Sequence, residues 1–289
     1  MENEKNKVEK STLYLVATPI GNLADISERA KKVLSEVDFV AAEDTRNSMK
    51  LLSVFGIKKE LVSYFEHNKK SSGERIIARL IMGESCALIT DAGMPAISDP
   101  GEDIVRLAAE AGITVSVIPG ASAAVSALAL SALSTSRFAF EGFLPAQKSE
   151  KRKRLEAVKH EPRTMIFYEA PHKLKATLSD MMDIFGGERK ISLCRELTKL
   201  NEEIIRTTLA CAVRLYSEKE PRGEYVLVLE GAEEAGCMYS EVQNPLLSLS
   251  PREHVEKYIA GGMGKMDAIK TVAKERGVPK SEIYDAMID

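Results

Sequence analysis

Short apolar runs alternate with amphipathic segments along the first 118 residues of the chain. The expected strands are the apolar runs at residues 12–17, 37–42, 86–90 and 114–118. The expected helices are the segments at residues 25–36, 45–54, 71–82 and 101–111. This alternation predicts a mostly parallel sheet with helices on both faces.

Pro119-Gly120 interrupts this alternation, and the order of elements then changes. A small apolar helix is predicted at residues 121–132. The expected strands beyond it are residues 138–143, 164–168, 190–194, 203–209 and 225–230, with helices at 171–185 and 209–217. Because several of these strands follow one another directly, the pattern favours a mixed sheet. We therefore expect two α/β domains, residues 1–120 and 121–232.

A polar segment and three short helical stretches end the chain. Residues 233–249 carry Gly, Ser, Asn and Pro, which is typical of a linker. The expected helices are residues 252–260, 265–276 and 279–288, separated by Gly261-Gly262 and by Pro279. The region 233–289 fits a helix-turn-helix extension and, equally, a packing appendage or a dimer contact.

Composition narrows the class of protein. Hydrophobic residues make up 44% of the chain and charged residues 29%, as in a soluble globular protein. No apolar run approaches the roughly 20 residues that span a bilayer, and the polar start MENEKNKVEK lacks the apolar core of a signal peptide. The four cysteines form no C-x-x-C pair, which favours buried thiols in a reduced cytoplasmic protein over a metal site.

Three predicted strands end in loops rich in glycine, proline and small residues. These loops are residues 18–22 (TPIGN), 91–101 (DAGMPAISDPG) and 119–123 (PGASA). Ligands collect beyond the carboxyl ends of strands in open parallel sheets, so we expect the loops to lie together. Any one loop alone is more simply a tight turn, whereas three together favour a ligand site.

The loop sequences restrict the ligand. None is G-x-G-x-x-G, and Pro19 removes an amide that a pyrophosphate site would use. The chain shows no Walker loop, zinc spacing or Ser-His-Asp arrangement, and we expect no metal. Carbonyls, small side chains and a carboxylate suit a nucleoside or a sulfonium cation better than a dinucleotide.

Several runs together resemble one known family. They are LYLVATPIGNLADIS, AAEDTR, LITDAGMPAISDPG, VIPGASA, FEGFLP, FYEAPHK and LCRELTK, in order between about Leu13 and Glu230. These runs are similar to the ribosomal RNA small-subunit methyltransferase I family, a branch of the class III methyltransferases, which have the tetrapyrrole methylase fold. The C-terminal helical unit also resembles that of the family.

The resemblance implies two α/β domains with S-adenosylmethionine in the cleft between them, and a homodimer. It implies 2′-O-methylation of a cytidine in the decoding region of small-subunit (16S) ribosomal RNA, either free or in the assembled small ribosomal subunit. Matched motif by motif, it implies cofactor contacts from Pro19, Asp91, Ala92, Gly93, Ala96, Ser122, Ala123, Tyr168, Glu169, Leu197, Glu224 and Tyr225. A Gly-Gly-Asp triplet is commoner in class III enzymes where this chain has Asp91-Ala92-Gly93.

Methyl transfer to a ribose needs a base, because a hydroxyl is a poor nucleophile. A positioned base typically contributes about 10²–10⁴-fold. The leading catalytic candidates are Glu43, Asp44 and Arg46, which follow the second predicted strand. For Asp44, capping of the following helix is at least as well supported.

RNA contact requires a local basic patch, because 40 basic and 43 acidic residues give a net charge of -3. Five cations gather in seven residues: Lys148, Lys151, Arg152, Lys153 and Arg154. Such a run is usually a solvated helix face, but it follows a strand-end loop, so we expect phosphate contacts there. His172 is a further candidate for RNA contact or base catalysis, although a lone histidine is more often structural.

Two other functions stay open. A class III methyltransferase acting on a tetrapyrrole or a protein side chain would have the same fold, but AAEDTR, FYEAPH and the basic run argue against it. A non-catalytic ribosomal RNA-binding assembly factor would need no cofactor, which the loops at Asp91 and Pro119 disfavour.

Overall fold

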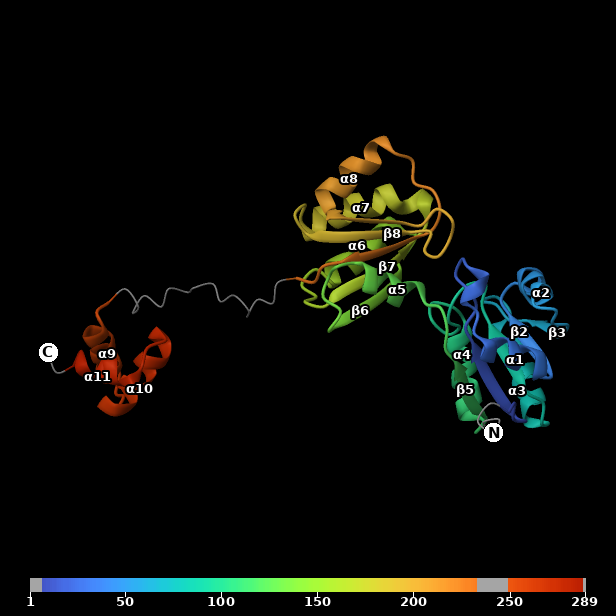
Figure 1. The fold of residues 1–289 in the computed structure, drawn as a ribbon, viewed down its shortest axis with the longest axis horizontal. Helices are drawn as coiled ribbons and strands as arrows, with labels where there is room; N and C mark the ends of the chain where they lie inside the picture. Colours follow the sequence, from blue (N-terminus) through green and yellow to red (C-terminus); the bar gives the residue numbers. More distant parts are fainter. Residues whose placement is uncertain (1–6, 233–248, 288–289) are drawn as a thin grey trace. The chain divides into compact units, whose positions relative to one another are not determined.

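The computed structural model describes residues 7–232 and 249–287, and contacts divide the chain into two compact units (Figure 1). The first unit comprises residues 1–232 and the second residues 233–289. The first six residues of the predicted tail and nearly all of the predicted linker, residues 233–249, lie outside the described residues. Within the described ranges, no helix has the length and apolarity needed to cross a membrane.

The first sheet is entirely parallel, as predicted. Its strands are β1 (Thr12–Val16), β2 (Phe39–Ala42), β3 (Glu60–Ser63), β4 (Cys86–Ile89) and β5 (Thr114–Ile118). They lie in the order β3-β2-β4-β1-β5. Leu13 pairs with both Cys86 and Val115 in parallel register. The carboxyl ends of all the strands therefore meet at one edge of the sheet.

Helices cover both faces of the first sheet. They are α1 (Glu28–Glu36), α2 (Thr45–Val54), α3 (Lys69–Ile81) and α4 (Gly101–Glu110). Leu34 of α1 and Leu52 of α2 join the core on one face, while Ile76 of α3 and Ile104 of α4 join the core on the other. This burial is the reason that apolar residues recur at helical spacing in these segments.

The first predicted helix begins later than expected. Residues 25–36 were expected to be helical, but a short 3₁₀ turn, η2 (Leu23–Asp25), precedes α1. The Asn22 side chain accepts the N–H of Ala24 at this turn, and the Ser27 hydroxyl accepts the N–H of Ala30 to start α1. Two capping side chains thus divide one polar segment into two elements.

The second sheet is mixed, as predicted. Its strands are β6 (Phe138–Phe143), β7 (Thr164–Glu169), β8 (Lys190–Arg195), β9 (Glu203–Thr208) and β10 (Tyr225–Leu229), in the order β6-β7-β10-β8-β9. Only the β6–β7 pair is parallel among these strands. One face packs against α5 (Ala123–Leu130), and the other against α6 (Lys148–Ala157), α7 (Pro171–Phe185) and α8 (Leu209–Glu218).

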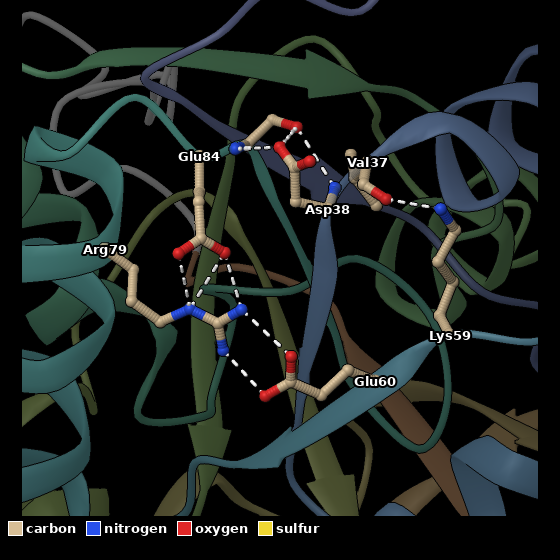
Figure 2. A network of polar contacts seen from close by, with 7 residues as sticks. Val37, Asp38, Lys59, Glu60, Arg79 and Glu84 are labelled. Atoms are coloured by element: carbon tan, nitrogen blue, oxygen red, sulfur yellow. Dashed lines mark hydrogen bonds and ion pairs between the residues drawn. The ribbon is translucent and has the colours of Figure 1, made fainter.

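A cluster of ion pairs and hydrogen bonds joins β2, β3 and β4 at their amino-terminal ends (Figure 2). The Arg79 guanidinium donates to both carboxylate oxygens of Glu60, at 2.7 and 2.9 Å, and also to Glu84. Beside it, Asp38 accepts the backbone N–H and the hydroxyl of Ser85, each at 2.7 Å. Bidentate, charge-assisted contacts of this kind fix geometry. They hold the sheet at the end opposite the carboxyl-end loops.

The second unit contains three helices among its described residues. They are α9 (Pro251–Ala260), α10 (Lys265–Arg276) and α11 (Lys280–Asp285), close to the predicted bounds. Ser250 and Glu253 form a capping box that starts α9. Val255, Ile269 and Ile283, one from each helix, are almost fully buried in a common core. The second unit therefore has a hydrophobic core of its own.

Candidate functional site

Carboxyl-end loops from both sheets enclose a pocket of about 540 Å³, called here the central pocket. Its walls are formed by Ile20, Glu43, Thr90, Asp91, Ala92, Gly93, Met94, Ile97, Ser98, Asp99, Ser122, Ala123, Phe143, Tyr168, Glu169, Ala170, Pro171, His172, Cys194, Glu196, Leu197, Lys199, Glu224, Tyr225 and Val226. Pockets that hold small ligands typically measure about 300–1,000 Å³. The central pocket is therefore large enough for a nucleoside-sized ligand.

Most of the residues expected to contact the cofactor line the central pocket. They are Asp91, Ala92, Gly93, Ser122, Ala123, Tyr168, Glu169, Leu197, Glu224 and Tyr225. Pro19 lines a neighbouring pocket instead. Ala96 contributes to neither wall. It has left-handed backbone (φ 67°), and its N–H donates to the Asp99 carboxylate at 3.0 Å. Its part is to shape the loop that presents Asp91.

The loop after β4 is held in one conformation by Asp99. Its carboxylate also accepts the N–H groups of Ile97 and Gly101, at 3.1 and 2.7 Å. Gly101 has to be glycine, because a Cβ there would lie 2.6 Å from Asp99 Oδ1. The start of the loop is fixed by a backbone bridge between Thr18 and Gly93. Side chains on this loop are thus positioned before any ligand binds.

A second constrained loop, after β8, forms the opposite wall. Glu196 and Thr198 both have left-handed backbone, with φ values of 52° and 64°. The Lys199 ammonium donates to Glu196 at 2.9 Å and to Glu224 at 2.7 Å. The loop packs so closely on Gly21 that a Cβ there would lie 2.4 Å from Lys199 Cγ. The pairing of Lys199 with both carboxylates depends on this packing, so no local sequence pattern predicts it.

The structure separates the three catalytic candidates. Glu43 lines the central pocket with an exposed side chain, and partial desolvation there raises its pKa, as do the nearby carboxylates of Asp91 and Asp99. Asp44 instead caps α2, accepting the N–H of Arg46 at 2.8 Å, and pairs with the Arg46 guanidinium at 3.0 Å. These contacts lower the pKa of Asp44 to about 2. Neither Asp44 nor Arg46 contributes to the central pocket.

Glu169 and Tyr168 close the central pocket at the end of β7. Glu169 is buried, and its carboxylate accepts the Thr177 hydroxyl at 2.5 Å and the Ala170 N–H at 2.8 Å. These two bonds fix the carboxylate at the start of α7. Tyr168 makes an edge-on ring contact with Phe143, at 5.3 Å between centroids, and burial raises its pKa. Tyr168 is thus a neutral aromatic wall.

The predicted RNA-binding residues fall into two groups. A groove of about 440 Å³, the basic groove, is lined by Leu144, Pro145, Ala146, Lys148, Lys151, Glu169, His172, Lys173, Ala176, Thr177, Ser179 and Asp180. Lys148, Lys151 and His172 therefore face one groove, and Glu169 and His172 belong to the central pocket as well. Arg152, Lys153 and Arg154 lie outside it. Arg154 pairs with Glu141 at 2.7 Å, and Arg152 lies 3.5 Å from Asp180.

A further pocket of about 350 Å³, the side pocket, adjoins the central pocket. It is lined by Pro19, Ile20, Gly21, Leu23, Asn47, Ser48, Leu51, Thr90, Asp91, Ala92, Lys199 and Glu224. Asp91 and Ala92 belong to the walls of both pockets. Asn47 of α2 donates its amide N–H to Asp91 Oδ2 at 3.1 Å. Asn47 was not predicted, because only the fold brings α2 beside the loop after β4.

The central pocket is acidic. Its carboxylates come from Glu43, Asp91, Asp99, Glu169, Glu196 and Glu224, whereas Lys199 and His172 are its basic side chains. Apolar side chains from Ile20 and Leu197 complete the wall. This combination suits a ligand with a positively charged group and an apolar or aromatic part. The basic groove beside it suits an anion.

Comparisons with known proteins bear on this arrangement. Residues 12–212 match the family model described as tetrapyrrole (corrin/porphyrin) methylases. A protein of Halalkalibacterium halodurans named ribosomal RNA small subunit methyltransferase I is 51% identical, over 98% of this chain and 97% of its own. A protein of the same name from Bacillus subtilis is 49% identical, over 97% of this chain and 95% of its own.

Solved structures show the same fold at lower identity. A uroporphyrin-III-C-methyltransferase from Thermus thermophilus is 20% identical, with a TM-score of 0.54 over 75% of this chain and 94% of its own. A diphthine synthase is 15% identical, with a TM-score of 0.58 over 76% of this chain and 90% of its own. At these identities the likeness shows the fold alone.

Proposed function

Because the chain belongs to the tetrapyrrole methylase family and, within it, to the ribosomal RNA small subunit methyltransferase I proteins, we propose that it methylates small-subunit ribosomal RNA. The acceptor is the 2′-hydroxyl of a cytidine in the decoding region, and the methyl donor is S-adenosylmethionine. The observation that carries the proposal is an acidic pocket for a cationic nucleoside next to a basic groove for phosphates.

The residues present fit the cofactor. The pocket volume of about 540 Å³ and its surplus of carboxylates suit a nucleoside with sulfonium and ammonium charges. Ser122 and Ala123 are small enough for close approach to the backbone, and Leu197 and Tyr225 supply apolar surface for the adenine. When bound, S-adenosylmethionine supplies an electrophilic methyl group.

Glu43 is the proposed general base. Its carboxylate would take the proton of the 2′-hydroxyl as that oxygen accepts the methyl group that bound S-adenosylmethionine would supply. A base is more effective when its pKa is nearer to the working pH, and both partial desolvation and the neighbouring carboxylates raise the pKa of Glu43. Asp91, next to Glu43, orients the ribose by accepting a hydrogen bond.

The RNA backbone binds in the basic groove. Lys148 and His172 contact phosphates there, and Lys153, exposed on α6, adds to the field that attracts RNA. Lys151 also lines the groove, but its side chain is buried and paired with Asp180 at 2.6 Å, so its part is to hold the groove in shape. This division keeps phosphates away from the carboxylates of the central pocket other than Glu169, which lines both. The RNA partner we propose is free ribosomal RNA or the assembled small subunit. We also propose that the protein is a homodimer and that it acts in the cytoplasm.

The test is methyl transfer to a mapped nucleotide. The protein is incubated with methyl-labelled S-adenosylmethionine and either unmodified small ribosomal subunits or free RNA, and the label is mapped by nuclease digestion and mass spectrometry. We expect label on the 2′-oxygen of one cytidine. Cofactor binding without label on either RNA substrate would overturn the proposal and favour a tetrapyrrole or protein substrate. A lack of cofactor binding by calorimetry would favour an assembly factor.

A further inference from the structure

The side pocket has no part in the proposed methyl transfer, yet it adjoins the central pocket in which that reaction is proposed to occur. It shares Asp91 and Ala92 with the central pocket, and Glu43 lines the central pocket close enough for Asp91 to raise its pKa. We propose that the side pocket receives the base of the target nucleotide and that Asn47 reads it as cytosine. This inference rests on the proposed function, since it requires an RNA substrate.

The position of the side pocket fits a nucleoside that lies across Asp91 and Ala92, the wall that the side pocket shares with the central pocket. A ribose at Asp91 places its 2′-hydroxyl on the central-pocket side, next to Glu43. The base, attached at the neighbouring ribose carbon, then lies on the side-pocket side. A base unstacked from a single-stranded loop is typically recognised through its Watson–Crick edge and its faces. The side pocket offers both kinds of surface.

Apolar side chains of the side pocket suit the faces of a flat ring. Leu23 is 46% exposed in the structure although it is a large hydrophobic residue, and Pro19 and Leu51 lie on the same pocket. A bound base would cover this apolar surface. The pocket's cation, Lys199, is already paired with Glu196 and Glu224. The side pocket is therefore better suited to a neutral base than to a phosphate.

Asn47 presents a fixed hydrogen-bonding pattern to this pocket. The Asn47 amide nitrogen donates to the Asp91 carboxylate. Because an ionised carboxylate only accepts hydrogen bonds, this contact fixes which end of the amide is the nitrogen and which is the oxygen. Within the described residues no partner occupies Asn47 Oδ1, and the second amide N–H is also available. Oδ1 can accept the cytosine amino group while this N–H donates to the cytosine ring nitrogen. Uracil has a carbonyl oxygen in place of the amino group and an N–H in place of the ring nitrogen acceptor, so neither hydrogen bond with Asn47 can form and uracil is rejected.

The experiment compares two RNA substrates that differ only at the target base. Small subunits are reconstituted with either cytidine or uridine at the mapped position, and kcat/KM is measured for both. For Asn47→Ala we expect the preference for cytidine to fall roughly ten- to hundred-fold, as when one bidentate base contact is lost. The Tm should stay close to wild type, because the Asn47 side chain is exposed. Any effect that reaches the cofactor or the ribose through Asp91 would change kcat/KM for both RNAs equally, so the ratio of the two values isolates base reading.

Two further variants separate base reading from simpler effects. Ser53→Ala, on an exposed part of α2, is the matched control and should leave the preference unchanged. Leu23→Ala should lower kcat/KM for both RNAs equally, because it removes apolar contact without changing hydrogen bonds. An unchanged cytidine preference in Asn47→Ala would overturn the inference while leaving the proposed function intact. If the wild-type protein methylated neither RNA, the proposed function itself would fail.

Discussion

Two adjacent carboxylates, Glu43 and Asp44, show how the environment of a residue decides its role. Glu43 faces the central pocket, where partial desolvation and other carboxylates raise its pKa. Asp44 turns to the start of α2, where the N–H and the guanidinium of Arg46 lower its pKa to about 2. A carboxylate stabilised this strongly is a poor proton acceptor. Glu43 is therefore the candidate that can remove a proton near neutral pH.

Replacement of Glu43 by Gln should reduce kcat for methyl transfer by about 10²–10⁴-fold, the usual contribution of a general base. The Kd for S-adenosylmethionine, measured by calorimetry, should rise far less than kcat falls, since five other carboxylates of the central pocket remain to attract the cationic cofactor. Asp44→Ala is the matched control, and it should lower the Tm by loss of the helix cap while kcat is retained. A large loss of kcat in Asp44→Ala instead would point to Asp44 as the base.

Glu43→Gln should also stabilise the folded protein at neutral pH. A carboxyl whose pKa is raised above 4.5 on folding binds its proton more readily in the folded state. The folded state therefore loses stability as pH rises from about 4.5 through the raised pKa, and the penalty persists at neutral pH. Because the Glu43 side chain is exposed and its charge is screened by solvent, Glu43→Gln should show only a slightly higher Tm than wild type near pH 7 and no difference below about pH 4. An equal Tm at both pH values would argue against the raised pKa.

At the scale of elements, loops fixed by close packing shape the central pocket. The loop after β8 approaches Gly21 so closely that a Cβ at Gly21 would lie 2.9 Å from the carbonyl oxygen of Leu197. Leu197 itself lines the central pocket. A change at Gly21 is therefore transmitted through Leu197 to the wall of the central pocket, although Gly21 itself does not line that pocket.

Gly21→Ala should displace this loop. Overpacking of this kind typically costs about 1–3 kcal/mol, so the Tm should fall, and the Kd for S-adenosylmethionine should rise as Leu197 moves. Gly261→Ala is the control, since a Cβ there would meet no atom closer than 3.4 Å and leave both quantities nearly unchanged. If Gly21→Ala behaved like the control, the loop would be more adaptable than its packing indicates.

Most elements could be predicted from the apolar pattern, and the exceptions have local causes. The strand β3 (Glu60–Ser63) was missed because it is short, lies at the sheet edge, and only Val62 is buried. Within the site, the loops carrying Asp91 and Ser122 were found because they end predicted strands. Asn47 was not placed in the site, because its contact with Asp91 joins segments distant in sequence and no local pattern encodes it.

At the scale of the whole molecule, the two units have separate cores and should unfold separately. His254 is buried in the second unit, with Nδ1 accepting from Arg276 Nε at 3.2 Å and Nε2 lying 3.0 Å from Glu275 Oε2. Desolvation lowers the pKa of His254 below 6.5, the Arg276 charge lowers it further, and Glu275 partly opposes both. The buried ring is therefore held in its neutral form.

Acidification should destabilise the second unit selectively. As pH falls below 6.5, the unfolded chain binds a proton at His254 before the folded chain does, so stability is lost. Calorimetry should show two transitions, with the one assigned to the second unit moving to lower temperature between about pH 7.5 and pH 5.5. His254→Phe should reduce this shift. A single cooperative transition at both pH values would contradict the independence of the units.

The wall shared by the central and side pockets has a consequence for inhibitor design. A molecule that joins an adenosine-like group to a pyrimidine across Asp91 and Ala92 could occupy both pockets at once. Its second group would then bind intramolecularly, at an effective concentration of the order of millimolar for a short linker. Selectivity would come from the pyrimidine side, because the groups that meet it, Asn47 and Leu23, lie outside the central pocket.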